Sequence, residues 1–241
     1  IIGGGQLGRM LAMSAKEMGY KIAILDPSKD ACARHFADTF IHADFDNRKG
    51  LERLCQISNV VTFEFENIDS DLLAELEKDY YIVQSARLLK TAQHRLLEKE
   101  FARSLGIETV DYQYVDQDTT GVQVDGTYLM KTVRFGYDGK GQSRITEASQ
   151  VQPYTLLERL VPLDKEISVV AYKDRTGIGI VAVVENEHRN NILYRSIVPT
   201  TASPEQEAQA IDYTRRILEA ADYYGVLTVE FFISQGRVIF N

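Results

Sequence analysis

Short apolar runs alternate with amphipathic stretches over the first third of the chain. The β-branched and aromatic residues of these runs are typical of strands, and the stretches between them carry helical periodicity. Strands that alternate with helices form parallel sheets with helices on both faces. We therefore predict a Rossmann-like α/β domain over residues 1–84. Its strands are expected at IIG (1–3), KIAILD (21–26), TFIHAD (39–44), NVVTFEFE (59–66) and YYIVQ (80–84).

The first helix of this domain is expected to span Gln6 to Met18. Gly19 follows it, and glycine is typical of the position just after a helix. Further helices are expected near Asp30, from Asn47 and from Ser70. The positions of the first helix that follow the i, i+3, i+4 pattern are Leu7, Met10, Leu11, Ser14 and Met18.

A charged helical stretch over residues 85–105 interrupts the alternation and is expected to connect two domains. The sequence that follows is rich in β-branched and aromatic runs separated by turn residues, which predicts an α+β domain over residues 106–241. The predicted strands of this domain are VDYQYV (110–115), TYLMKTV (127–133), QSRIT (142–146), YTLLERLV (154–161), KEISVVAYK (165–173), IGIVAVVENEH (178–188) and ILYRSIV (192–198).

One long helix and one hairpin are expected near the end of the chain. Ser203 precedes Pro204, and Gln206 follows three residues after Ser203, which is a capping-box arrangement at the start of a helix. The runs GVLTVEFFI (225–233) and RVIF (237–240) flank a turn at SQG (234–236) and predict a terminal hairpin.

The charge of the chain argues against nucleic acid as a partner. Lys and Arg total 27 against 35 for Asp and Glu, which gives a net charge of −8. The basic residues form no block that could follow a phosphodiester backbone. An apolar run of about 18 residues, as a membrane-spanning helix requires, does not occur in the sequence. We therefore expect a cytoplasmic protein with neither a nucleic-acid nor a membrane partner.

The two cysteines, Cys32 and Cys55, are far apart in the sequence and belong to no Cys-x-x-Cys motif, so we expect reduced packing residues. Both ends of the chain look cut. The first strand begins at Ile1, and the chain stops at Asn241 directly after an apolar run. We expect sequence to be missing at both ends, and mostly at the second.

Two glycine-rich segments carry candidate chemistry, and the first lies at the start of the chain. Gly3, Gly5 and Gly8 satisfy Gly-x-Gly-x-x-Gly between a strand and a helix, and Asp26 ends the second strand. This spacing is typical of a dinucleotide site, because the glycines allow close approach and the helix N-terminus attracts an anion. A purely structural turn and a site for another phosphate-bearing ligand remain as alternatives. The sequence downstream resembles neither a second half-sheet nor a hydride-acceptor pocket.

The second glycine-rich segment is MKTVRFGYDGKGQ (130–142). It places Lys131 in a strand and three glycines within six positions, next to Arg134 and Lys140. Such a loop could cover a triphosphate, since backbone N–H groups and a lysine would neutralise the charge of the phosphates. A plain β-hairpin with an Asp-Gly turn is the alternative.

Three glutamates in strand-like runs extend this hypothesis. Glu158 lies in one apolar strand and could be a solvated edge residue, and Glu166 begins the next strand. Alternation places Glu230 on one face with Val226, Thr228 and Phe232, where an acid is costly unless it is paired or binds a cation. A Mg²⁺ ligand is one explanation and an internal salt bridge is the other. His188, between ENE and RNN, is either a turn residue or part of a nucleotide site.

These segments in this order resemble the ATP-grasp superfamily, and the similarity is closest to the 5-(carboxyamino)imidazole ribonucleotide synthase family of purine biosynthesis. The resemblance runs through essentially the whole chain. It is carried by GGGQLGRML, LDP, TFEFEN, RLLEKEF, GYDGKGQ, ERLVPLDKEISVV, VVENEHRNNILYRSIVP and GVLTVEFF. The family implies a Rossmann-like domain, an ATP-grasp domain of two α+β subdomains and a smaller C-terminal domain, the last of which this sequence lacks.

The resemblance also implies roles for individual residues. Glu230 matches a Mg²⁺ ligand of the family, and a second acidic ligand would follow Asn241. The positions that match ATP contacts are Arg95, Lys131, Gly136, Tyr137, Asp138, Gly139, Lys140, Gly141, Gln142, Glu158, Arg159, Leu160, Val161, Glu166, His188 and Asn241. Positions that match the ribonucleotide site are Gln6, Leu7, Glu64 and Glu66, with Tyr137, Asp138 and Lys140 nearest the chemistry.

The implied reaction is the ATP-dependent carboxylation of aminoimidazole ribonucleotide with bicarbonate, through carboxyphosphate. The implied cofactors are ATP and Mg²⁺, and the family tends to form homodimers. Three other functions remain as alternatives at this point. They are another ATP-grasp ligase, of the formate-dependent glycinamide ribonucleotide transformylase or biotin carboxylase type, an NAD-dependent oxidoreductase, and a nucleotide sensor without catalysis.

Overall fold

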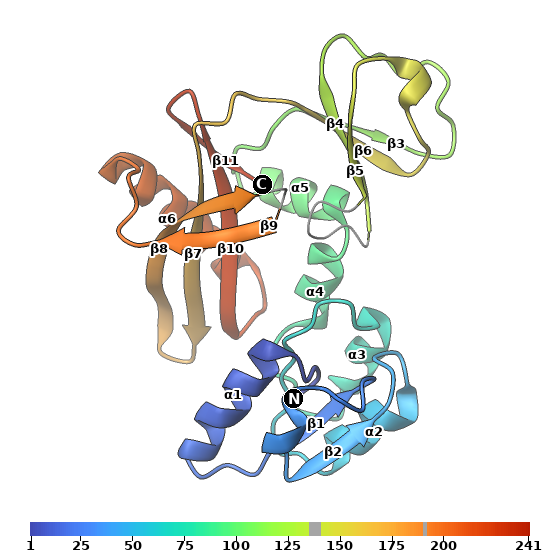
Figure 1. The fold of residues 1–241 in the computed structure, drawn as a ribbon, viewed down its shortest axis with the longest axis vertical. Coiled ribbons are helices and arrows are strands. Elements are labelled where there is room, and N and C mark those ends of the chain that lie inside the picture. The colour runs from blue at the N-terminus through green and yellow to red at the C-terminus, as the bar shows by residue number, and fades with distance from the viewer. Residues whose placement is uncertain (135–140, 190–191) are drawn as a thin grey trace. The chain divides into compact units, whose positions relative to one another are not determined.

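Two units make up the chain (Figure 1). The computed structural model describes residues 1–134, 141–189 and 192–241. The contacts within it divide the chain into residues 1–90 and residues 91–241. Within the described residues, no helix combines the length and the apolar character needed to cross a membrane.

A parallel sheet lies at the centre of the first unit. Strand β1 (Ala23–Asp26) pairs in parallel with β2 (Thr39–His42). Parallel bridges extend the sheet from Leu25 to Ile2, from Ile2 to Phe63 and from Val61 to Ile82. The predicted N-terminal parallel sheet is confirmed, and its apolar residues are buried because both faces are covered.

Helices cover this sheet. Asn47 caps α2 by accepting a hydrogen bond from the backbone N–H of Gly50, and Asp69 caps α3 in the same way. The helix expected near Asp30 is a single 3₁₀ turn further along the chain. The helical elements of this region are α1 (Gln6–Glu17), η1 (Arg34–Phe36), α2 (Arg48–Gln56), α3 (Ser70–Leu76) and α4 (Ala86–Ala92).

The side of α1 that packs on the first unit carries small residues. Gly8 and Ala12 are the buried residues of this helix, whereas Leu7 and Met10 are 63% and 64% exposed. A Cβ atom on Gly8 would lie 2.4 Å from the carbonyl oxygen of Gly3. The helix therefore approaches the glycine-rich turn too closely for larger side chains.

The charged stretch predicted as a connector forms two helices, α4 and α5 (Arg95–Ser104). The chain leaves helical geometry between them, at His94. The backbone N–H of Arg95 donates to the carbonyl oxygen of Val133, so the start of α5 is hydrogen-bonded to the segment that follows residue 132. Lys99 and Ala102 are the buried residues of α5.

Two antiparallel sheets form the second unit (Figure 1). The four-stranded sheet has the order β3-β6-β4-β5, and the five-stranded sheet has the order β11-β10-β7-β8-β9. The strands of the first are β3 (Tyr112–Val115), β4 (Tyr128–Thr132), β5 (Gln142–Ile145) and β6 (Thr155–Arg159), and a 3₁₀ turn, η2 (Ala148–Gln150), lies between β5 and β6. Those of the second are β7 (Lys165–Asp174), β8 (Gly177–Arg189), β9 (Ile192–Ile197), β10 (Gly225–Ser234) and β11 (Arg237–Phe240).

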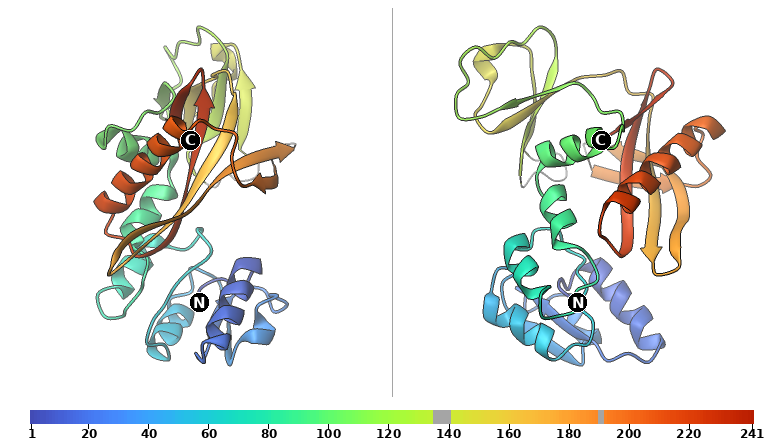
Figure 2. Two further views of the ribbon diagram at one scale, coloured as in Figure 1. Left: turned by 90° about the vertical axis from the view of Figure 1, so that its left-hand side faces the viewer. Right: turned by 180° about the vertical axis from the view of Figure 1, so that it is seen from behind.

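Helix α6 (Pro204–Ala220) packs against the five-stranded sheet (Figure 2). Ser203 caps it and forms the predicted capping box with Gln206. The other face of the sheet is open, since Val226, Thr228 and Glu230 of β10 are exposed while Val229 and Phe231 are buried. Alternation along β10 therefore places Glu230 on the open face, and its exposure removes the burial cost expected from the sequence.

Candidate functional site

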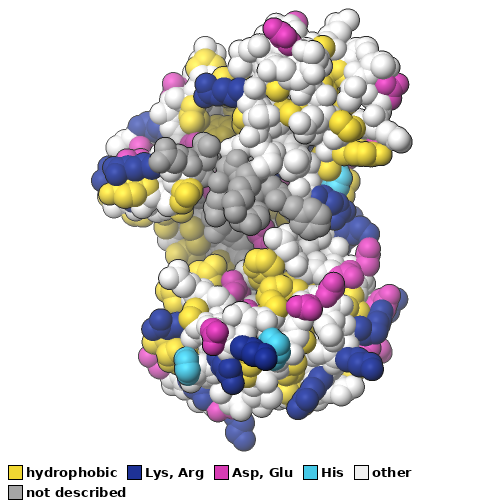
Figure 3. Space-filling view, turned by 45° about the vertical axis from the view of Figure 1, so that its right-hand side comes forward, with side chains coloured by type: hydrophobic (Ala, Val, Ile, Leu, Met, Phe, Trp, Pro, Cys, Tyr) yellow, Lys and Arg dark blue, Asp and Glu magenta, His cyan; other side chains and the backbone are white. Residues whose placement is uncertain are grey.

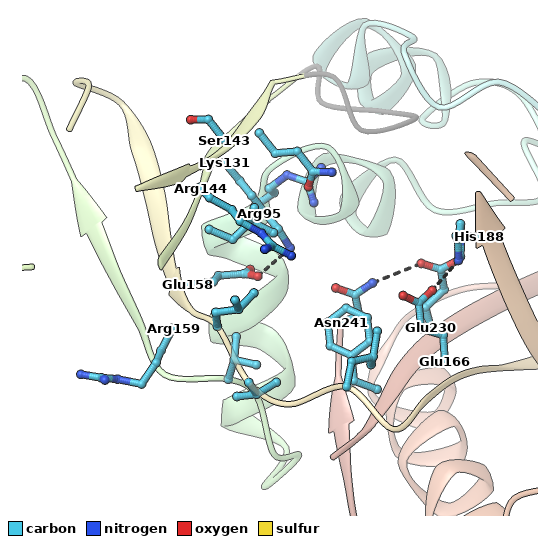
Figure 4. A pocket seen from close by; sticks show the side chains of 17 residues that line it. Arg95, Lys131, Ser143, Arg144, Glu158, Arg159, Glu166, His188, Glu230 and Asn241 are labelled. Carbon is cyan, nitrogen blue, oxygen red and sulfur yellow. Dashed lines mark hydrogen bonds and ion pairs between the residues drawn. The ribbon is translucent and has the colours of Figure 1, made fainter. Parts of the chain in front are cut away.

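A pocket of about 570 Å³ is lined by both sheets of the second unit (Figure 4). Polar and charged groups gather on two walls, and apolar side chains lie between them. The lining residues are Arg95, Val110, Leu129, Lys131, Gln142, Ser143, Arg144, Glu158, Arg159, Leu160, Val161, Leu163, Glu166, His188, Glu230, Phe232 and Asn241.

One wall holds a buried cluster of charges. Lys131 Nζ lies 2.6 Å from Glu158 Oε2, and Lys99 Nζ lies 3.4 Å from Glu158 Oε1. The three side chains are only 4–6% exposed. Strand β6 is an inner strand of its sheet, so Glu158 is not the solvated edge residue that the sequence left as an alternative. The two lysines offset the cost of burying the carboxylate.

The pKa values of this cluster reflect that balance. Burial opposes ionisation of Glu158, but Lys99 and Lys131 outweigh it and lower the pKa of the carboxyl below its ordinary value. Burial lowers the pKa of Lys99 to about 8, with an opposing contribution from Glu158. Two ammonium groups thus share one carboxylate, and the wall carries an excess of positive charge.

The opposite wall carries carboxylates on the open face of the five-stranded sheet. His188 Nδ1 lies 2.5 Å from Glu166 Oε2. The pKa of Glu166 is raised, first by burial and also by the neighbouring Glu230, while His188 opposes the shift. The side-chain amide of Asn241 donates to Glu230 Oε2 at 3.4 Å (Figure 4).

The donors on this wall fit a hard divalent cation. Mg²⁺ prefers oxygen ligands and is usually held by one or two carboxylates together with waters and substrate phosphates. Glu230 is exposed, and its carboxylate is close enough to raise the pKa of Glu166. No ion pair of Glu230 is found within the described residues, which disfavours the internal salt bridge. In the same part of the chain, no group of three or more His, Cys, Asp or Glu side chains forms a complete metal site.

Most residues predicted to contact ATP lie around this pocket, and their roles in binding remain predictions. Those that line it are Arg95, Lys131, Gln142, Glu158, Arg159, Leu160, Val161, Glu166, His188 and Asn241, together with the predicted metal ligand Glu230. Gly141 does not line the pocket. Its carbonyl accepts a hydrogen bond from the backbone N–H of Thr132, and its φ of 71° suits glycine. Gly136, Tyr137, Asp138, Gly139 and Lys140 lie outside the described residues.

Sequence reasoning did not select several residues of the site. Leu129 and Phe232 follow from strand alternation, because each is two positions from a predicted site residue and so shares its face. No sequence signal marked Lys99, since a lysine in a charged helix is usually solvated. The remaining lining residues without a prediction are Val110, Ser143, Arg144 and Leu163.

Two N–H groups of the first glycine-rich turn already donate to carboxylates of the same unit. The backbone N–H of Gly4 donates to Asp26 Oδ2 at 2.7 Å, and that of Gly5 donates to Glu64 Oε1 at 3.0 Å. Asp26 also accepts from the backbone N–H of Ser28 at 2.7 Å. A pyrophosphate at this turn would meet two carboxylates, which disfavours the dinucleotide alternative. Gln6, Leu7, Glu64 and Glu66 all belong to the first unit.

The cysteines agree with the sequence prediction, and one face of the surface can be described by its charges. On the face seen in Figure 3, basic and acidic side chains are interspersed. Cys32 and Cys55 are both free thiols. A mixed surface of this kind is unlike the continuous basic footprint typical of nucleic-acid-binding proteins.

Comparisons with known proteins cover the whole chain. Residues 1–93 match the ribonucleotide synthetase preATP-grasp domain, and residues 100–241 match the ATP-grasp domain. The N5-carboxyaminoimidazole ribonucleotide synthase of Bacillus subtilis is 37% identical over 255 residues, covering 100% of this chain and 67% of the relative. The same enzyme of Brucella melitensis is 37% identical, covering 100% of this chain and 71% of the relative.

Solved structures agree with these relatives. The crystal structure of N5-carboxyaminoimidazole synthetase from Staphylococcus aureus complexed with ADP gives a TM-score of 0.92 at 35% identity, covering 100% of this chain and 68% of that one. The chain therefore spans about two thirds of the length of such relatives.

Proposed function

Because the chain belongs to the N5-carboxyaminoimidazole ribonucleotide synthase family, we propose that it catalyses the ATP-dependent carboxylation of 5-aminoimidazole ribonucleotide with bicarbonate. The products are N5-carboxyaminoimidazole ribonucleotide, ADP and phosphate. The observation that carries the proposal is one pocket with Arg95 and Lys131 on one wall and Glu166 and Glu230 on the other. Cations and carboxylates so arranged suit a nucleotide triphosphate and its metal ion.

The reaction has two steps. A bicarbonate oxygen attacks the γ-phosphorus of ATP, the bond from this phosphorus to the bridging oxygen breaks, and ADP leaves with that oxygen. The exocyclic amine of the ribonucleotide then attacks the carboxyl carbon of carboxyphosphate. The bond from carbon to the phosphate oxygen breaks, phosphate leaves, and the amine loses one proton. Neither step requires a nucleophilic side chain, so the work of the protein is positioning and charge stabilisation.

The residues of the pocket divide this work between them. Leu129, Leu160 and Phe232 offer apolar surface to the purine ring, and the paired Glu166 and His188 present polar groups to the ribose hydroxyls. Lys131 and Arg95 stabilise the charge on the phosphates. Glu230, with Asn241 beside it, would hold Mg²⁺, which supplies charge neutralisation at the phosphates when bound.

The acceptor is assigned to the first glycine-rich turn, through Gln6, Leu7, Glu64 and Glu66. Glu64 already accepts a hydrogen bond from Gly5, and its carboxylate can accept another from an amine of the ribonucleotide. Tyr137, Asp138 and Lys140 are assigned to the reacting groups, with Gly136, Gly139, Gly141 and Gln142 as the rest of a loop that excludes water. The protein is further proposed to be a cytoplasmic homodimer.

The test is ADP formation by the full-length protein, with Lys131→Met as the matched control variant. We expect bicarbonate and aminoimidazole ribonucleotide together to stimulate ADP release at least tenfold, and the variant to lose that stimulation. Two other substrate pairs are tested in parallel: formate with glycinamide ribonucleotide, and bicarbonate with biotin. Stimulation by either of these, or none by aminoimidazole ribonucleotide, would overturn the proposal.

A further inference from the structure

Lys99 is absent from the lining of the pocket, although it belongs to the same charge cluster as Lys131. It sits one helical turn after Arg95 on α5, and its side chain is 4% exposed. Burying an ammonium group without a partner is costly, and a methionine of similar length would fill the same space without that cost. The charge of Lys99 therefore calls for an electrostatic explanation.

The side chain of Lys99 is held by Phe240 of β11 as well as by Glu158. Its Nζ donates to the carbonyl oxygen of Phe240 at 3.1 Å and lies 5.5 Å from the centre of the Phe240 ring. The distance from Nζ to Glu158 Oε1 is 3.4 Å, longer than a hydrogen bond, and Oε1 accepts no hydrogen bond from the described residues. Lys99 is thus anchored to β11 and acts on Glu158 as a fixed charge.

Lys131 is placed differently. It lines the pocket, and a 2.6 Å ion pair with Glu158 Oε2 links it to the cluster. A phosphate in the pocket would compete with Glu158 for this ammonium group. Taking the partner from a buried carboxylate is strongly destabilising when nothing replaces it.

We infer that Lys99 is a positioning residue that remains paired with Glu158 and so leaves Lys131 free to bind the phosphates of the nucleotide. This inference rests on the proposed function, in which Lys131 is a nucleotide ligand. With Lys99 in place, the carboxylate keeps one counter-ion after Lys131 turns to the ligand, and the cluster keeps its excess positive charge. Without Lys99, binding of the nucleotide either leaves the Glu158 carboxylate without a counter-ion or keeps Lys131 away from the phosphate.

The test is a double-mutant cycle on ATP affinity, measured by calorimetry on the full-length protein. Lys99→Met should raise the Kd for ATP at least tenfold. In a Glu158→Gln background the same change should alter Kd less than threefold, because a neutral side chain at position 158 needs no counter-ion. A merely structural Lys99 would give the same change in both backgrounds, and that result, or no change in either, would overturn the inference.

The wild-type protein gives a second measurement, which does not depend on a variant that folds. The charged groups that face Lys99 are Glu158 from β6, Lys131 from β4 and Glu98 from its own helix. Because the pKa of Lys99 is lowered to about 8, the ammonium loses its proton above that pH, and a bound anion favours the protonated form. The Kd for ATP should therefore rise between pH 8 and pH 9.5. A flat profile overturns the inference, whereas failure of the wild type to bind ATP at any pH would overturn the proposed function instead.

Discussion

At the scale of single residues, two carboxylates define the first glycine-rich turn. Asp26 and Glu64 accept hydrogen bonds from Gly4 and Gly5, the groups that a dinucleotide would need. A carboxylate at this position accepts hydrogen bonds and repels phosphate, so the turn suits a ligand that brings a donor. Glu64 is the side chain of this turn that our proposal assigns to the acceptor ribonucleotide.

Glu64→Gln tests that assignment. The amide oxygen can still accept from Gly5, but the charge that strengthens a hydrogen bond to the acceptor is lost, which is worth about 1.5–3 kcal/mol. We expect the KM for aminoimidazole ribonucleotide to rise about tenfold or more, while the Kd for ATP stays within twofold of the wild type. The partly exposed Glu52→Gln serves as a control for loss of one negative charge in the same unit. Equal effects of the two variants on KM would contradict the assignment.

At the scale of elements, α1 shows how close packing selects its buried side. Its periodicity predicted a helix from Gln6 to Met18, and the observed helix spans Gln6–Glu17 with Met18 as C-cap. The larger apolar side chains nevertheless point away from the core of the first unit, because the helix approaches Gly3 through Gly8. Small residues on the buried side allow that approach. The spacing of larger apolar residues does not mark such positions.

Ala12→Leu and Met10→Ala distinguish the two sides of α1. Ala12 is 0% exposed, so a larger side chain there should lower the free energy of unfolding by about 1–3 kcal/mol through overpacking. Met10 is largely exposed, and its truncation should change that free energy by less than about 0.5 kcal/mol. Urea denaturation midpoints at unchanged m-value measure both effects. A larger loss for Met10→Ala would show that its side chain is covered in the folded protein.

At the scale of the whole molecule, the predicted site residues are distributed over two units. All residues predicted to contact ATP lie in residues 91–241. The residues predicted to contact the ribonucleotide lie in both units, with Gln6, Leu7, Glu64 and Glu66 in residues 1–90 and Tyr137, Asp138 and Lys140 in residues 91–241. Each unit has its own sheet and its own buried core. Ligands that bind one unit should therefore leave a local signature in that unit.

Hydrogen exchange of the full-length protein tests this division. ATP alone should slow exchange in residues 128–132, 155–161 and 225–234, with little change in residues 3–9. Addition of aminoimidazole ribonucleotide should then slow exchange in residues 3–9. The expected effect is at least tenfold at saturating ligand, because bound ligand reduces the population of the open, exchanging form by the factor 1 + L/Kd, where L is the free ligand concentration. Protection of residues 3–9 by ATP alone would mean that the nucleotide binds the first unit.

Local signals in the sequence determined most of the elements. Alternation between strands and helices predicted the parallel sheet, and the capping box at Ser203 predicted the start of α6. The turn at SQG predicted the hairpin of β10 and β11. These features depend on neighbouring residues, so short segments of the sequence are enough to predict them. The family also followed from the order of motifs along the chain.

Only the tertiary structure decided the environment of each charged side chain. Glu158 and Glu230 both lie in strand-like runs, yet the first is buried between two lysines and the second lies on an open sheet face. The difference arises because Lys99 of α5 packs beside Glu158 of β6, whereas α6 covers the opposite face of β10. Burial and charge pairing depend on elements that are distant in sequence, so no local pattern could have shown that Lys99 belongs to the site.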